Sequence, residues 1–470
     1  MMTALTLPLD RSARTPLADQ IRDGIAKAID SGKLPPGARL PSWQDLASQL
    51  GVARGTVQVA YEKLVAAQLI VASRATGTRV ADQPVTTARS DRKPDPGSFM
   101  EMYREMTAGP AVFQMGIAGQ EIFPAKLLAR IRARAVRDES SAAPLYPDPR
   151  GEFDLRREIA AYLAIARGID CTPGQILVTS GFSAGLGLAL RALGLEGRTA
   201  WFEDPGFPFT KHALELARLS LVPVPVDAQG IDVDFGARHA PDAALAVVTP
   251  GQQAPLGVTM SLARRLALLD WATQANAWVI EDDYLSELQL KGRAAPALAS
   301  LDRTGRVIHI GTFSKTISPA LRLGFMVVPP SLVARFGEIA ACLAPPPGPA
   351  SQSAIAAFMR DGHYLRHLRR TKRTYAAQRD ALLKQLAPRA QDFDITTAGL
   401  AIALQLPRGA SDLTIIREML PFGLTPAPLS IWYASPEAAR PGLLLGIATS
   451  PIRHVARSCD RLLSVIDRFA

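Results

Sequence analysis

The sequence predicts a multidomain protein, with a small, mostly helical α+β unit at the N-terminus and a large α/β domain after it. The chain has 470 residues. This is too long for a single hydrophobic core, because domains usually hold roughly 100–200 residues. Apolar residues at helical spacing dominate the first part, whereas short apolar runs alternate with helical stretches in the rest, as in a largely parallel sheet. We expect domains at 1–81 and 111–470 and a linker at 82–110, with the second domain divided into a large part, about 111–350, and a small part, about 351–470.

Three helices are expected in the first unit. Apolar residues recur every four positions along Leu17–Ile29, which predicts an amphipathic helix. Pro35–Gly37 forces a turn after it. A second short helix fits Trp43–Leu50 and ends at Gly51, and a third fits Arg54–Ala67.

A β-hairpin should follow these helices. Two short apolar strands, Leu69–Val71 and Thr78–Val80, flank a tip at Arg74–Thr78 that could lie along a DNA backbone or minor groove. A helix, a tight turn and a second helix that opens with small or polar residues have the geometry that enters a major groove. In that second helix Arg54 could pair with a guanine edge or a phosphate, and Thr56 could reach a phosphate or a thymine methyl group.

The next segment changes character. Residues 86–96 are rich in Thr, Arg, Asp, Lys and Pro and are typical of a solvated linker, with some helix near Phe99–Met106. Buried strands of the large domain are expected at Ile176–Val178, Ala244–Val248, Trp278–Ile280, Val307–Ile310 and Phe325–Val328.

Composition narrows the class of protein. The formal net charge of +10 favours acidic partners such as nucleic acid or phosphate, although a drift toward Arg in the whole proteome would give the same excess. The cysteines Cys171, Cys342 and Cys459 are far apart and lack metal-ligand spacing, so we expect no disulfide, no metal site and a reducing cytoplasm. We also expect neither a signal peptide nor a membrane span, because the long uncharged stretches contain Pro, Gly and polar residues.

The strongest chemical cluster lies in the large domain and fits pyridoxal phosphate. That cofactor needs a primary amine, a carboxylate beside its pyridine nitrogen, and hydroxyl or cationic groups around its phosphate. Lys315 can supply the amine, Asp282 at a strand end the carboxylate, and Tyr284 a donor to the ring oxygen. The phosphate could be held by Thr312, Ser314 and Arg322.

Residues 16–81 resemble the winged-helix domain of the GntR regulators. The resemblance rests on Pro16-Leu17, Gly37–Ser42, Leu46-Ala47, Gly51–Val57, Tyr61–Leu64 and Gly77-Thr78. It implies double-stranded DNA as a partner and a DNA-facing set made of Arg39, Ser42, Arg54, Thr56, Gln58, Gly77 and Thr78. The family often has Arg where this chain has Gln44. In the alternative interpretation Arg39 forms only a local ion pair and Arg54 is a solvated surface residue.

Most of residues 111–450 resemble fold-type-I aminotransferases, and more closely the MocR-type subgroup of the GntR regulators. The matching segments include Tyr146–Gly151, Val178–Gly181, Glu203–Phe207, Pro255–Val258 and His367–Arg370. The resemblance implies phosphate contacts from Ser180, Gly181 and Phe182, with Phe207 stacked on the cofactor ring, Tyr146 reaching the phosphate of the other subunit of a homodimer, and Gln253 near the ring. Phe207 could instead be plain core.

Some positions depart from a working aminotransferase. Leu444 stands where such enzymes usually carry the Arg that clamps the substrate carboxylate, and Gly251–Gly257 fits neither the enzyme nor the regulator pattern. We therefore expect a cytoplasmic, DNA-binding transcriptional regulator that holds pyridoxal phosphate as a Schiff base and responds to an amine, an amino acid or the cofactor itself. One alternative is an aminotransferase that carries a DNA-binding domain, and another is a dimeric regulator without cofactor.

Neighbouring polar residues have structural explanations. Glu281 and Asp283 flank Asp282 and could cap a helix or pair with Arg, and His309 in a strand pattern fits a satisfied core residue.

Overall fold

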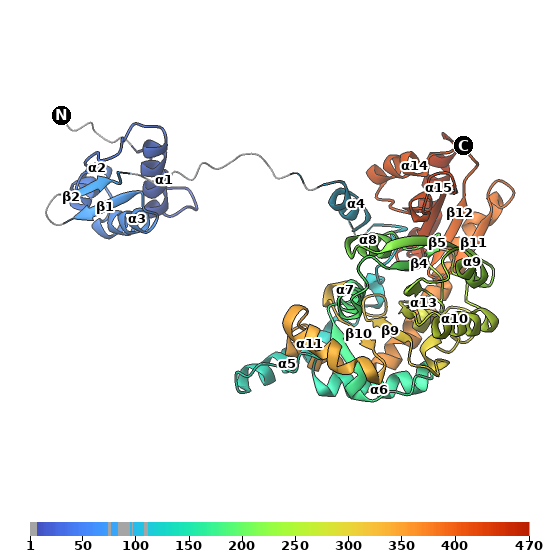
Figure 1. The fold of residues 1–470 in the computed structure, drawn as a ribbon. Coiled ribbons are helices and arrows are strands. Elements are labelled where there is room, and N and C mark those ends of the chain that lie inside the picture. Colours follow the sequence, from blue (N-terminus) through green and yellow to red (C-terminus); the bar gives the residue numbers. More distant parts are fainter. Residues whose placement is uncertain (1–6, 74–76, 83–94, 96, 108–110, 470) are drawn as a thin grey trace. The chain divides into compact units, whose positions relative to one another are not determined.

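The computed structural model describes residues 7–73, 77–82, 95, 97–107 and 111–469. They form two compact units, residues 1–101 and 102–470 (Figure 1). The predicted linker 82–110 falls partly outside the described residues, and its described end contains helix α4 (Ser98–Thr107), where the sequence predicts some helix.

The first unit contains the elements that its periodicity predicts. They are α1 (Leu17–Asp30), α2 (Trp43–Leu50), α3 (Arg54–Ala66), β1 (Ile70–Ser73) and β2 (Gly77–Val80). Strands β1 and β2 pair antiparallel. The backbone N–H of Leu40 donates to the Thr78 carbonyl at 2.9 Å, so the chain before α2 runs beside the hairpin. Residues 74–76 of the predicted tip lie outside the described residues.

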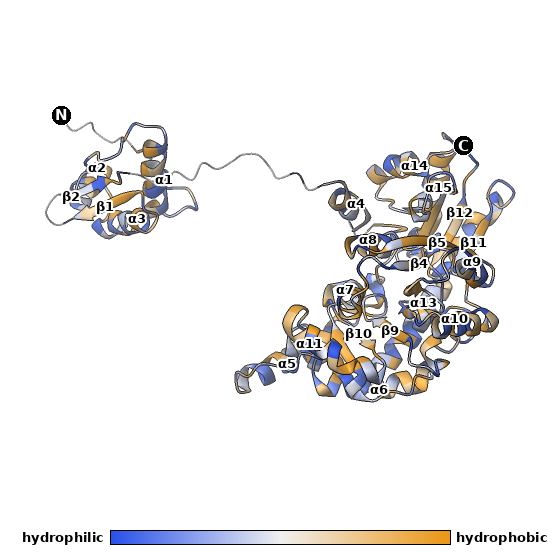
Figure 2. Cartoon of the chain, viewed as in Figure 1, coloured by the Kyte–Doolittle hydropathy of each residue, from blue (hydrophilic) through white to orange (hydrophobic). Residues whose placement is uncertain are grey.

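A small apolar core holds this unit together. Ile21 and Ile25 of α1 pack with Leu46 of α2 and Leu64 of α3, and all four are fully buried. The Tyr61 hydroxyl donates to the Pro41 carbonyl at 2.9 Å, which fixes the chain at the start of α2. In Figure 2 these helices show hydrophobic and hydrophilic residues along their length, as amphipathic helices do.

The second unit is built on an eight-stranded sheet. Its strands are β3 (Ile176–Thr179), β4 (Thr199–Asp204), β5 (Ser220–Asp227), β6 (Gly230–Ile231), β7 (Leu245–Val248), β8 (Trp278–Asp283), β9 (Val307–Thr312) and β10 (Gly324–Val327). Their order is β3-β10-β9-β8-β7-β4-β5-β6. The run from β9 to β5 is parallel, whereas β10 and β6 are antiparallel to their neighbours.

Helices cover both faces of this sheet. The helices of this unit are α5 (Ala125–Ser141), α6 (Phe153–Ala166), α7 (Phe182–Leu193), α8 (Pro208–Leu216), α9 (Val233–His239), α10 (Leu262–Gln274), α11 (Val333–Leu343), α12 (Pro349–Arg360), α13 (His363–Leu386), α14 (Asp412–Met419) and α15 (Ile452–Ile466). Ile280 of β8 packs in the cluster that includes α7 and α11, whereas Val279 packs in the cluster that includes α9 and α10. Successive residues of β8 therefore point to opposite faces.

A four-stranded antiparallel sheet forms the small part. Its strands are β11 (Ile395–Ala398), β12 (Ala401–Gln405), β13 (Ala427–Pro428) and β14 (Gly442–Gly446), in the order β11-β12-β14-β13. Leu443 and Leu445 pack in the cluster that holds α13 and α15. Among the described residues, no helix is long and apolar enough to cross a membrane.

Candidate cofactor site and nucleic-acid interface

The candidate site lies at one edge of the large sheet. Strands β3, β4, β8 and β9 run in one direction, so their carboxyl ends meet at the same edge, where open α/β sheets bind ligands. The strands end at Thr179, Asp204, Asp283 and Thr312.

Asp282 is the central acidic group of this edge. Asp282 lies two residues after Ile280 in β8, so its side chain points to the same face of the sheet as that of Ile280. The Asp282 side chain is buried. Its Oδ1 atom is buried and has no hydrogen-bond partner among the described residues. Burial, and then the neighbouring Asp283 carboxylate, raise the pKa of Asp282 well above its usual value, while Lys315 opposes the shift. The site thus holds a carboxyl oxygen without a protein donor.

Lys315 faces the same space. Its side chain is half-buried, and Nζ donates a 2.6 Å hydrogen bond to the Gly116 carbonyl. Burial lowers the pKa of Lys315, and Asp282 opposes this shift. A lysine with a lowered pKa is neutral, and therefore nucleophilic, in a larger fraction of molecules.

A second buried acid, Glu203, completes the floor of the site. It accepts hydrogen bonds from the Thr249 backbone N–H at 3.0 Å, from the Thr249 hydroxyl, and from Gln253 Nε2 at 3.3 Å. Burial raises the pKa of Glu203 to about 7. Glu203, Thr249 and Asp282 line one small cavity together with Phe207. Burial and the Asp282 charge also raise the pKa of Tyr284.

The predicted phosphate residues gather at the ends of β3 and β9. Gly181 precedes α7 with a φ of 90°, a conformation that favours glycine. Gly324 pairs with both Thr179 and Thr312, and a Cβ added to it would lie 3.0 Å from the Gly181 Cα. These backbones therefore approach each other closely. The first N–H groups of α7 lack partners inside the helix and could face an anion.

The side chains around this turn differ in exposure. Ser180, Phe182 and Ser314 are half-buried, Thr312 is buried, and Arg322 is exposed. The Thr312 hydroxyl accepts from the Ser314 backbone N–H at 3.1 Å. Arg322 has a φ of 47° at the end of a short helical turn.

Three other predicted residues, Gln253, Phe207 and Tyr146, are not part of the turn that would face the phosphate. The Gln253 amide is used within the protein, because Nε2 donates to the Pro205 carbonyl at 2.7 Å and Oε1 accepts from the Leu256 N–H at 3.0 Å. Phe207 is half-buried, with its ring centroid 5.6 Å from that of Trp432. Tyr146 is fully exposed on this chain.

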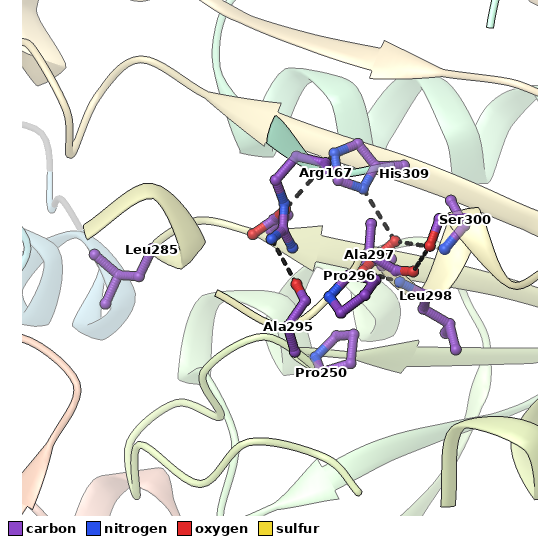
Figure 3. A network of polar contacts seen from close by, with 12 residues as sticks. Arg167, Pro250, Leu285, Ala295, Pro296, Ala297, Leu298, Ser300 and His309 are labelled. Atoms are coloured by element: carbon purple, nitrogen blue, oxygen red, sulfur yellow. Dashed lines mark hydrogen bonds and ion pairs between the residues drawn. The ribbon is translucent and has the colours of Figure 1, made fainter. Parts of the chain in front are cut away.

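The neighbours of Asp282 in β8 belong to a paired charge layer, and Figure 3 shows Arg167 and His309 of this layer among their polar contacts. Arg167 Nε donates to Asp283 at 2.8 Å, and both side chains are almost completely buried. Glu281 accepts from the backbone N–H groups of Leu298 and Ala299 at 2.7 and 3.0 Å and pairs with His309 at 3.0 Å. Although burial acts in the opposite direction, His309 and these donors lower the pKa of Glu281 to about 2. These contacts confirm the structural explanations expected for Glu281, Asp283 and His309.

In the first unit, the predicted DNA-facing residues occupy α3 and the hairpin. Arg54 and Gln58 of α3 are exposed and Thr56 is half-buried. Arg39 is exposed, and its Nε would lie 3.5 Å from a Cβ added to Gly77. In the described part of the chain, neither Arg39 nor Arg54 forms an ion pair, so both cations are available.

The remaining members of this set have local partners. Ser42 is the N-cap of α2 and accepts from the Asp45 N–H at 3.1 Å. The Gln58 amide donates to Glu62 at 3.1 Å. The Thr78 carbonyl accepts from Leu40, so its backbone is used in the fold.

Two residues at the site, Glu203 and Gly116, are not predicted from the sequence. Glu203 lay in a segment that carried the family resemblance, but nothing in its neighbours indicates burial against Thr249. Gly116, which accepts from Lys315, contributes a backbone carbonyl, and residue type does not reveal such a role.

Comparison with known proteins covers both units. Residues 17–80 match the family described as bacterial regulatory proteins, gntR family, and residues 118–419 match aminotransferase class I and II. The chain is 33% identical over 458 residues to the probable rhizopine catabolism regulatory protein MocR of Rhizobium meliloti, covering 94% of this chain and 92% of the relative. It is 30% identical to the pyridoxine biosynthesis transcriptional regulator PdxR of Corynebacterium glutamicum, covering 81% of each.

The solved structures that match are aminotransferases. An archaeal alanine:glyoxylate aminotransferase superposes with a TM-score of 0.72 at 24% identity, over 79% of this chain and 94% of that one. The α-aminoadipate aminotransferase LysN of Thermus thermophilus gives 0.70 at 25% identity, over 78% and 94%. The second unit therefore has the fold-type-I aminotransferase fold that the sequence predicts.

Proposed function

The chain belongs to the MocR-type subgroup of the GntR transcription regulators, and from this premise we propose that it binds pyridoxal phosphate as a Schiff base at Lys315 and regulates transcription in response to an amine ligand. The first unit would bind an operator in double-stranded DNA. The second, aminotransferase-like unit would sense the ligand, because a ligand shifts an equilibrium only through its different affinities for two states.

The observation that carries the proposal is the buried Asp282 Oδ1 atom, which has no donor in the described chain. A buried acceptor without a partner costs roughly 1–3 kcal/mol, and a protonated pyridine nitrogen would supply the missing donor. Asp282 would thereby hold the ring in its protonated form. The residues present fit the cofactor.

The other residues would bind and orient it. When bound, pyridoxal phosphate supplies an aldehyde, which condenses with a primary amine, and an electron-withdrawing ring. Lys315, with its lowered pKa, would be that amine, and its bond to Gly116 would be given up. The turn at Ser180-Gly181 and the start of α7 would face the phosphate, with Thr312, Ser314 and Arg322 beside it.

The chain is proposed to act as a homodimer. Tyr146 is fully exposed and would reach the phosphate of the other subunit. Two DNA-binding units would then meet two half-sites.

A labelling experiment tests the cofactor site. The full chain, loaded with pyridoxal phosphate and reduced with borohydride, should gain the mass of one reduced cofactor at Lys315, and Lys315→Ala should gain none. Lys211→Ala is the matched control, because Lys211 is a half-buried lysine whose Nζ donates to the Ala434 carbonyl at 3.2 Å. Equal labelling of Lys315→Ala and the unaltered chain would refute the assignment.

A second experiment tests the DNA-binding unit. Arg54→Ala should weaken operator binding by about 1–3 kcal/mol at fixed salt if Arg54 contacts a base. The control is Arg22→Ala, because Arg22 pairs with Asp19 and Asp23 on α1. The operator fragment would come from the DNA upstream of the protein's own gene. Unchanged affinity in Arg54→Ala would mean that α3 does not read the bases.

A further inference from the structure

Helix α13, labelled in Figure 1, carries a row of exposed arginines. Its first twelve residues, 363–374, include five Lys or Arg residues and no Asp or Glu. Four of the five are three or four positions apart, so they lie on one side of the helix, which turns once in about 3.6 residues. We call these four the basic stripe; it comprises Arg366, Arg369, Arg370 and Arg373.

The basic stripe faces away from the body of the large unit. Its four arginines are exposed, whereas Tyr364, His367, Thr371 and Tyr375 on the opposite side of α13 are buried. The buried side holds the helix in place, because His367 Nε2 lies 2.6 Å from the Thr316 carbonyl oxygen. One side of α13 therefore anchors the helix, and the other presents the stripe to solvent.

The acids that flank the stripe along the chain are already paired with other cations. Asp361 pairs with Arg360 at 3.7 Å, and Asp380 pairs with Arg379 at 2.7 Å. Arg366 donates to the backbone carbonyl of Asp361 at 3.0 Å. In the described chain no arginine of the stripe forms an ion pair, so its charge is not neutralised within the protein.

The short turns that pack against α13 also keep their acids for other partners. These turns contain Glu121 and Glu287. Glu121 pairs with Arg453 at 3.5 Å. Burial raises the pKa of Glu287 to about 7, and Glu287 opposes the fall in the pKa of Lys372 that burial causes. Lys372 lies on α13 but outside the stripe.

The neighbouring helix α15 adds positive charge. It packs against α13 and carries the exposed arginines Arg453, Arg457 and Arg461. The acid Asp460 lies beside Arg461 in the sequence. The surroundings of the stripe are therefore basic as well.

Such a surface needs a partner of opposite charge. Like charges three or four positions apart on a helix repel each other, and Arg366 lies near the N-terminus of α13, where the helix dipole is also positive. An anionic partner would remove this repulsion, and guanidinium groups bind phosphate through paired hydrogen bonds.

The dimensions of the stripe suit a DNA backbone. From Arg366 to Arg373 the helix rises roughly 10 Å, and the phosphates of one DNA strand are spaced about 3.4 Å along the duplex axis. The stripe can therefore meet about three phosphates of one strand.

The first unit gives DNA the advantage over other polyanions. Residues 17–80 match a family of bacterial regulatory proteins. Because both units belong to one chain, DNA held by the first unit has a high effective concentration for the second. A contact with phosphates would add affinity without reading the sequence.

From these observations we infer that the basic stripe of α13 binds the phosphate backbone of the DNA that the first unit holds. The large unit would thus make a second, sequence-independent DNA contact. This inference rests on the proposed function, because it assumes that the chain binds an operator.

Two triple variants of the full chain test it. The stripe variant combines Arg369→Gln, Arg370→Gln and Arg373→Gln. The control variant replaces three exposed arginines that form surface ion pairs, and it combines Arg157→Gln, Arg218→Gln and Arg335→Gln. Both variants lose three positive charges, so a difference between them reports where the charges lie.

Binding to a fluorescent operator fragment is measured by anisotropy at several salt concentrations. Near 0.1 M salt the stripe variant should bind roughly tenfold more weakly than the control variant. Each phosphate contact contributes about 0.9 to the slope of log K against log salt, so the stripe variant should have a slope that is about 2–3 shallower. A fragment with a scrambled operator should show the same change in slope, because a backbone contact does not read bases.

Stability and assembly are measured on the same variants. The stripe variant should be at least as stable to denaturant as the control variant, because repulsion has been removed. Its sedimentation coefficient without DNA should match that of the unaltered chain. A changed coefficient would overturn the inference, because the stripe would then be a contact between copies of the chain. Equal affinities and slopes in the two variants would also overturn it and would leave the stripe to an acidic protein.

The unaltered chain separates this inference from the function beneath it. If that chain binds no operator fragment, the proposed function fails. If it binds the operator and loses affinity in Arg54→Ala, but keeps its salt slope in the stripe variant, only the inference about α13 fails.

Discussion

Strand β8 carries three consecutive acids, and the two faces of the large sheet surround them differently. Glu281 and Asp283 point to the face where backbone N–H groups and His309 bind Glu281 and where Arg167 donates to Asp283 Oδ2. Asp282 points to the opposite face and keeps one buried oxygen without a donor in the described chain. Asp283 Oδ1 also lacks a donor, so the difference between the two aspartates is the cation: Asp283 is paired with Arg167, whereas Asp282 has no ion pair in the described chain.

The pKa values of these buried acids are also shifted in opposite directions. Burial raises the pKa of Asp282 and of Glu203, which line the same small cavity. In the paired layer, His309 overcomes burial and lowers the pKa of Glu281. Folding therefore favours protonated acids at the cavity and an ionised Glu281 in the paired layer.

The largest expected effect comes from breaking the paired face. Arg167→Met leaves the buried Asp283 without its cation, and such a loss typically destabilises a protein by about 3–5 kcal/mol. Chemical denaturation of the cofactor-free full chain, followed for the large unit, would measure it. Arg335→Met is the control, because Arg335 pairs with Glu338 on the surface, and exposed pairs contribute roughly 0.2–1 kcal/mol.

A double variant sharpens this test. Replacing both Arg167 and Asp283 by apolar residues removes the two charges together, and such replacements are often close to neutral. If Arg167→Met alone costs no more than Arg335→Met, the paired layer does not stabilise the large unit and the contrast between the faces fails.

The next effect concerns Glu203, which lines the small cavity with Asp282, and it depends on pH. Glu203 has a pKa of about 7 in the folded chain against roughly 4.3 when unfolded. The folded state thus holds a proton that the unfolded state releases, and the free energy of unfolding falls as pH rises between these values. At about 1.4 kcal/mol per pKa unit, Glu203 accounts for a fall on the order of 3 kcal/mol.

Glu203→Gln should remove this part of the pH dependence, as measured by denaturation at several pH values between roughly 3.3 and 8, about one unit on either side of the titration. Glu281→Gln should instead change the free energy of unfolding at acidic pH. An acid with a lowered pKa stabilises the fold above its unfolded pKa, and this contribution is lost as the pH falls toward the folded pKa. Glu338→Gln, on the surface, serves as the control. A profile that is the same in Glu203→Gln and the unaltered chain would contradict the raised pKa.

The sequence predicts one face better than the other. Lys315, Asp282 and Tyr284 could be assigned because a cofactor requires particular residue types at strand ends. The partner of Asp283 could not be assigned, because Arg167 is more than a hundred residues away and only the packing of α6 against the sheet brings it near. Glu203 was missed because burial, rather than its residue type, gives it a raised pKa.

The fold itself follows a similar division. The elements of the first unit were each predicted, because its helices follow the local spacing of apolar residues and its turns follow glycine and proline. In the large sheet, β4 and β5 were not among the expected strands. Strand β5 contains Pro223 and Pro225, residues that argue against a buried strand, and it pairs with the two-residue strand β6 at the end of the sheet, where proline is tolerated.

The smallest expected change in stability comes from Asp282→Asn. The substitution removes a buried carboxyl group that lacks a donor, so the free energy of unfolding of the cofactor-free chain should stay the same or rise by up to about 1 kcal/mol. Retention of pyridoxal phosphate should fall sharply, because an amide offers no negative charge to the protonated ring nitrogen. Asp283→Asn is the matched control on the neighbouring residue, and it should destabilise the chain, because Arg167 then keeps a buried charge without its partner. Equal losses of stability from the two substitutions would mean that both faces of β8 serve only the fold, and that Asp282 is not reserved for a ligand.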